Sequence, residues 1–84
     1  MNPVRTIIKL DTGKHYVVST VRLSFDHSFG HGAPQLFETM VFESDGEDVS
    51  NWMDLDCERY ATEDEAREGH EKVVEKWRSG QEDV

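Results

Sequence analysis

The stretch that decides the fold is TEDEAREGHEKVVEKWRS, residues 62–79, which predicts one C-terminal helix. It opens with a capping-box pattern, in which the Thr62 hydroxyl accepts a hydrogen bond from the third helical N–H and Glu65 reaches back. Acids fill the first turn, and Lys76 and Arg78 lie in the last turn, as the helix dipole favours. One stripe of the helix is expected to face a core, and it consists of Ala66, His70, Val73 and Trp77.

Upstream of this helix the chain predicts strands. Residues 4–25 alternate apolar and polar side chains around a turn at Gly13, which predicts a β-hairpin. Residues 35–44 predict a third strand, and residues 55–60 can add a short fourth one with Leu55 and Cys57 on its inner side. The fold class expected is therefore α+β, with a three- to four-stranded antiparallel sheet followed by one helix packed on one face of a single domain. The connections are expected to be a loop with two glycines and a proline at 26–34 and an acidic loop at 45–54.

Both faces of the predicted strands carry apolar side chains, and one helix can cover only one face. Burying a large apolar side chain fully is worth about 1.5–3 kcal/mol, so exposing four or five would remove much of a small domain's stability. We therefore expect the second face to contact another copy of the chain, most simply as a two-fold dimer. The residues assigned to this oligomer face are Ile7, Tyr16, Val18, Phe37 and Val41.

The charge of the chain is strongly negative and uneven. Eighteen acids against nine bases give −9. Residues 1–40 hold three acids and four bases, whereas residues 41–84 hold fifteen acids and five bases. Such a surface disfavours direct binding to nucleic acids and to anionic membranes, and it attracts basic partners. The other interpretation of this charge is that it only keeps the protein soluble.

The remaining composition indicates a cytoplasmic protein without catalytic machinery. A single cysteine excludes an internal disulfide, and no apolar run is long enough to span a membrane. No motif for a nucleophile, a phosphate loop or a zinc protease is present, so we expect neither an enzyme nor a cofactor. His27, His31 and Asp26, together with Cys57 and His70, could supply metal ligands, but the paired spacing of zinc motifs is missing and no metal is expected.

Three polar or small residues that lie inside apolar patterns also lead to predictions. His70 is interpreted as a half-buried, packed histidine bonded to a strand carbonyl, with a ligand-facing role as the alternative. Gly69 beside it indicates that the helix closely approaches a neighbouring strand or ligand. Glu38 interrupts an apolar strand face and is expected to pair with Arg22 or Arg5.

Three strings resemble a family of short proteins of tailed bacteriophages and prophages. They are YVVSTVRL at 16–23, FETMVF at 37–42 and RYxTxxEAxxGHxxxV at 59–74. The resemblance covers about residues 4–77. It implies a phage accessory protein that acts in the bacterial host cytoplasm, and it implies no particular chemistry.

The hypothesis we favour from the sequence is a non-enzymatic protein of the anti-defence type that binds a host protein stoichiometrically, with a DNA mimic as a special case. Acidity and one large apolar residue in the acidic segment support it. The residues assigned to partner binding are Trp52, Asp45, Glu47 and Asp48.

Two alternatives remain open. One is an oligomeric sponge for a nucleotide signal, in which arginines contact phosphate and an aromatic ring stacks on a base. Its ligand-binding residues would be Arg5, Arg22, Phe29, His31 and His70. The other is a minor virion or assembly component.

Overall fold

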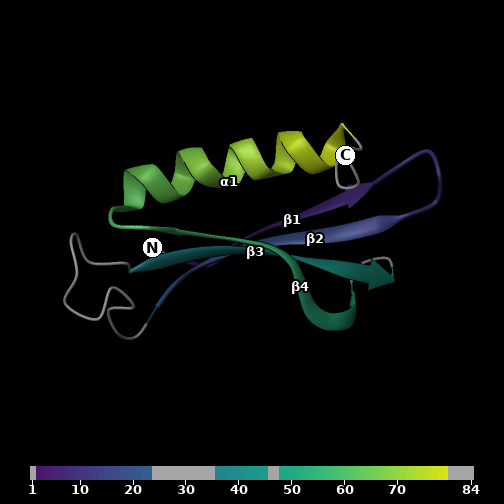
Figure 1. Cartoon of the computed structure of the whole chain (residues 1–84), viewed down its shortest axis with the longest axis horizontal. Helices are drawn as coiled ribbons and strands as arrows, with labels where there is room; N and C mark the ends of the chain where they lie inside the picture. Colours follow the sequence, from purple (N-terminus) through teal and green to yellow (C-terminus); the bar gives the residue numbers. More distant parts are fainter. Residues whose placement is uncertain (1, 24–35, 46–47, 80–84) are drawn as a thin grey trace.

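The computed structural model describes residues 2–23, 36–45 and 48–79. Four antiparallel strands form one sheet in the order β1-β2-β3-β4, and one helix follows and packs on the sheet (Figure 1). This arrangement confirms the predicted α+β class. The elements are β1 (Val4–Lys9), β2 (His15–Arg22), β3 (Phe37–Asp45), β4 (Asp48–Tyr60) and α1 (Glu63–Arg78).

The N-terminal hairpin forms as predicted. Strands β1 and β2 pair from Val4 opposite Thr20 to Lys9 opposite His15. Gly13 has φ of 91° in the turn, a left-handed conformation that glycine adopts without steric cost. The predicted loop at 26–34 lies outside the described residues.

The C-terminal helix also forms as predicted, and its capping box is complete. The Glu65 N–H donates to the Thr62 hydroxyl at 3.1 Å, and the Thr62 N–H donates to the Glu65 carboxylate at 3.2 Å. The helix ends at a Ser79 cap, whose N–H donates to the Glu75 carbonyl.

The prediction of an acidic loop at 45–54 is wrong for the part that the structure describes. Strand β4 begins at Asp48 rather than at residue 55, and Asp45 and Asp48 face each other across the hairpin end. Asp, Ser and Asn have low intrinsic strand preference, but strand formation depends mainly on the neighbouring strand. Pairing with β3 therefore outweighs the local composition.

The assignment of the oligomer face is also wrong. Tyr16, Val18 and Val41 lie in the core together with the α1 residues Val73, Val74 and Trp77. The physical reason is the register of the first hairpin, in which Ile8 stands opposite Tyr16 and Ile7 opposite Val17. Phe37 alternates with Val41 on the α1 side of β3, so Ile7 alone of the five lies on the opposite face.

The face opposite α1 is nevertheless apolar. Val17 and Phe42 are already buried within one chain, with 1% and 8% of their surfaces exposed. Less apolar surface remains on this face for a second copy than the sequence suggested. Its apolar residues are Ile7, Val17, Val21, Met40 and Phe42.

Candidate interaction site

Strand β4 contains a wide bulge, which is the most distinctive surface feature of the described chain. Val41 pairs with Asp56 and Glu43 pairs with Asn51. Between these pairs β3 has one residue, Phe42, and β4 has four, at 52–55, so β4 carries three extra residues. The curl of β4 in Figure 1 shows where the strand departs from the regular sheet.

This bulge displays the large apolar side chains that the described surface exposes most. Trp52, Met53 and Leu55 are 75%, 73% and 41% exposed. Leu55 was expected on the inner side of a short strand, and the extra residues of the bulge turn it outward instead. Exposed apolar clusters of this kind mark interaction sites more often than isolated exposed residues do.

The Trp52 ring is held in place rather than free in solvent. Its centroid lies 5.4 Å from that of Phe42, in an edge-to-face arrangement typical of favourable aromatic pairs. Phe42 lies on the sheet face opposite α1, so Trp52 covers part of that face. A rigid aromatic ring with most of its surface exposed suits the role of a binding anchor, because little side-chain entropy is lost on contact.

The two ends of the bulge are fixed by side chains. At the first end, the Asn51 side-chain oxygen accepts a hydrogen bond from the Met53 N–H at 3.0 Å. At the second end, the Asp56 carboxylate accepts from the Cys57 N–H at 2.9 Å. The first bond satisfies a backbone donor inside the bulge, and the second involves Cys57, which pairs with Met40 directly beside the bulge.

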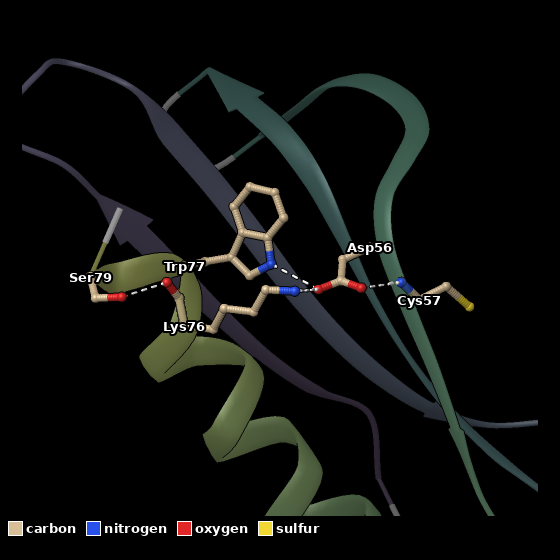
Figure 2. Close-up of polar contacts among 5 residues, drawn as sticks. All are labelled: Asp56, Cys57, Lys76, Trp77 and Ser79. Carbon is tan, nitrogen blue, oxygen red and sulfur yellow. Dashed lines mark hydrogen bonds and ion pairs between the residues drawn. The ribbon is translucent and has the colours of Figure 1, made fainter. Parts of the chain in front are cut away.

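Asp56 also joins the bulge to the helix (Figure 2). Its Oδ2 atom accepts from Lys76 Nζ at 3.0 Å and from the Trp77 indole N–H at 3.1 Å. Burial alone would raise the pKa of the Asp56 carboxyl, but the two hydrogen bonds and the Lys76 charge hold this pKa below its usual value. The carboxylate therefore stays ionised at neutral pH and anchors the end of the bulge to α1.

The electrostatic setting of the bulge is acidic throughout. Residues 43–58 contain seven acids and no lysine or arginine. Asp45, Asp48 and Asp54 are exposed, and all three belong to the β3–β4 hairpin. Glu47, the remaining residue assigned to partner binding, lies outside the described residues. The structure thus brings Trp52, Asp45 and Asp48 onto one hairpin.

Glu38 is paired, but with a residue that the sequence did not indicate. Arg59 Nε donates to its carboxylate at 2.8 Å, because the two residues are cross-strand neighbours in β3 and β4. The predicted partners Arg22 and Arg5 do not make this contact. Burial and the negative charge of Glu38 raise the pKa of the Cys57 thiol to about 11, so this thiol stays protonated near neutral pH.

Of the described residues predicted to form a nucleotide pocket, Arg5 is separated by the sheet from Arg22 and His70. Arg5 lies opposite Ser19 on the face away from α1, whereas Arg22 alternates with Thr20 on the α1 side. His70 is buried under the helix with 2% of its surface exposed. Phe29 and His31 lie outside the described ranges, as do His27 and Asp26.

A groove of about 390 Å³ runs between α1 and β4. Local sequence patterns could not indicate it, because it forms where two elements cross. The Tyr60 hydroxyl beside it is buried and makes no hydrogen bond within the described part of the chain. The lining residues that carry charge are Asp56, Glu58, Glu65, Glu68, Lys72 and Lys76.

Within residues 2–23, 36–45 and 48–79, no cluster of three or more His, Cys, Asp or Glu side chains could hold a metal ion. No helix among the same residues is long and apolar enough to cross a bilayer. Comparison with protein-family models, with curated proteins and with solved structures gave no match.

Proposed function

We propose that this chain is a non-enzymatic protein that binds a basic partner protein stoichiometrically through the β4 bulge. The observation that supports this function is the bulge itself, which displays Trp52, Met53 and Leu55 on a segment without positive charge. Apolar anchors supply affinity at a protein interface, while surrounding charges select partners and accelerate association. The resemblance to phage and prophage proteins suggests a bacterial host protein as the partner, met in the host cytoplasm.

The test has two steps and uses the full chain. Affinity capture from bacterial lysate identifies a partner, and calorimetry with the purified partner measures the dissociation constant. Trp52→Ala should raise this constant about thirtyfold, which corresponds to an anchor worth about 2 kcal/mol. Asp48→Lys should weaken binding and reduce its dependence on salt concentration, because it reverses a charge beside the anchor.

A matched control variant distinguishes the effect of charge at the bulge from the effect of the net charge of the chain. Glu75→Lys changes the net charge by the same amount at an exposed position on α1, outside the β3–β4 hairpin. It should leave affinity within about twofold. Equal effects of Asp48→Lys and Glu75→Lys, or no effect of Trp52→Ala, would show that the bulge is not the binding site.

The sponge for a nucleotide signal is less well supported, because Arg5 and Arg22 lie on opposite faces and His70 is buried. A thermal-shift panel of nucleotides provides its test. A ligand present at 100 times its dissociation constant would stabilise the fold by about 2.7 kcal/mol. A shift of that size would favour the sponge over the protein binder.

A further inference from the structure

A row of buried polar side chains crosses the sheet beneath α1. The Thr6 hydroxyl lies 2.8 Å from Nε2 of His70, and the Thr20 hydroxyl lies 2.6 Å from its Nδ1. The Thr20 hydroxyl in turn lies 2.5 Å from that of Thr39. These four side chains come from β1, α1, β2 and β3, so a single imidazole joins the helix to the sheet within an otherwise apolar core.

The neutral form of His70 fits this site completely. A neutral imidazole has one N–H donor and one nitrogen acceptor, and a threonine hydroxyl can serve either of them. Both ring nitrogens are therefore satisfied without any charge. A second proton would place a positive charge in a site where His70, Thr20 and Thr39 are each at most 2% exposed.

Few opposite charges are available to compensate such a proton. The α1-facing positions of β1 (Val4, Thr6 and Ile8) are uncharged, as are the first three of β3 (Phe37, Thr39 and Val41). Further along this face of β3 lies Glu43, which is exposed and stands opposite Tyr16 rather than opposite Thr20. On β2 the charged residue of this face is Arg22, which would repel the proton. On β4 the face holds Glu58 and Tyr60, and also Asp56, which is engaged with Lys76 and Trp77.

On α1 itself, Glu71 follows His70 directly. Burial lowers the pKa of His70, and the negative charge of Glu71 opposes this shift without reversing it. In the unfolded chain this imidazole has an ordinary pKa of about 6.5.

We propose that His70 is an acid-sensitive latch, in which proton uptake by the buried imidazole weakens the docking of α1 on the sheet. The direction of the pH dependence follows from the linkage between proton binding and folding. Because the folded state binds this proton less tightly than the unfolded state, docking is fully stable above about pH 6.5 and weakens as the pH falls below it. The equilibrium constant for release then rises by up to about tenfold per pH unit, until the folded state also takes up the proton.

Trp77 provides the signal for the test. It is buried, and its ring centroid lies 5.0 Å from that of Tyr16 on β2. The chain has two tryptophans, so Trp52→Phe leaves Trp77 as the single one. Its emission during urea unfolding reports whether α1 is docked.

The experiment compares Trp52→Phe alone with Trp52→Phe combined with His70→Gln, at pH 7.5 and pH 5.0. In the first protein the release constant should rise by up to about thirtyfold at the lower pH. In the second it should change less than threefold. Trp52→Phe with His15→Gln, which changes a histidine on the other face, should behave like the first protein. The same pH dependence with and without His70 would overturn the proposal.

A second measurement covers the case in which His70→Gln does not fold. Proton NMR of the imidazole Cε1–H in the wild-type chain gives the titration midpoint of His70 directly. A midpoint below 6.5 that coincides with loss of the Trp77 signal supports the latch. A midpoint at or above 6.5 overturns it.

Discussion

At the scale of single residues, Gly69 shows how one missing side chain sets the helix position. A Cβ atom built at Gly69 would overlap the outer ring atoms of Tyr60 on β4. The sequence predicted a close approach at this position, and the structure confirms it and identifies the tyrosine ring as the neighbour. The absent methyl group lets α1 pack directly against β4.

Gly69→Ala should therefore destabilise the fold although alanine is the better helix former. Alanine is favoured over glycine by about 1 kcal/mol in helix propensity. Forcing its methyl group against the Tyr60 ring is overpacking, which typically costs 1–3 kcal/mol. We expect a net loss of about 1 kcal/mol in the free energy of unfolding, measured by urea denaturation. In a Tyr60→Ala background the same change should stabilise, because the overlapping ring is gone. Destabilisation in both backgrounds would contradict this explanation.

Glu38 and His70 show which residue roles a local pattern can reveal. Their positions in apolar stripes indicated that Glu38 would be paired and that His70 would pack and bond to a strand, which the structure confirms. His70 is, however, fully buried rather than half-buried, and it bonds threonine hydroxyls rather than a strand carbonyl. Their partners Arg59, Thr6 and Thr20 come from other strands. Which of them meet depends on strand register and helix position, and neither is encoded locally.

At the scale of secondary structure elements, the bulge exposes side chains for contact with a partner but contributes few packing contacts to the fold. Its three extra residues shift the β3–β4 register between Asp56 and Asn51, and one further residue shifts it again between Asn51 and Val49. Removing residues 53–55 would place Trp52 opposite Phe42 in regular pairing. The side chains removed are mostly solvent-exposed, so few packing contacts are lost.

We expect deletion of residues 53–55 to change the free energy of unfolding by no more than about 1 kcal/mol, as is usual for exposed positions. Partner binding should fall at least tenfold, because the apolar cluster is no longer projected. Urea denaturation and calorimetry measure the two effects separately. Retained affinity in a folded deletion variant would mean that Trp52 alone forms the site.

At the scale of the whole molecule, we expect the uneven charge to control association. The homodimer expected from the sequence stays a prediction, but the exposed apolar surface that could join two copies lies elsewhere than expected. The face opposite α1 is partly buried already, and the large exposed apolar side chains are concentrated on the acidic bulge. Like charges at this site repel a second copy, whereas a basic partner is attracted.

The two kinds of association should therefore respond to salt in opposite directions. Raising the ionic strength from 0.1 M to 1 M shortens the screening length from about 10 Å to about 3 Å. We expect the dimer fraction in sedimentation equilibrium to increase over this range, while affinity for the basic partner decreases. A dimer that dissociates as salt rises would show that oppositely charged surfaces join the copies.

Taken alone, the sequence determined the elements and their order. The alternating residues around Gly13, the capping box at Thr62 and the acidity of residues 41–84 are local features, and local physical chemistry is sufficient to interpret them. Only the tertiary structure decided which sheet face α1 covers and where β4 begins. Both strand faces are apolar, so the alternation of side chains defines two faces without indicating which one α1 covers. That depends on strand registers and on contacts between residues far apart in the chain.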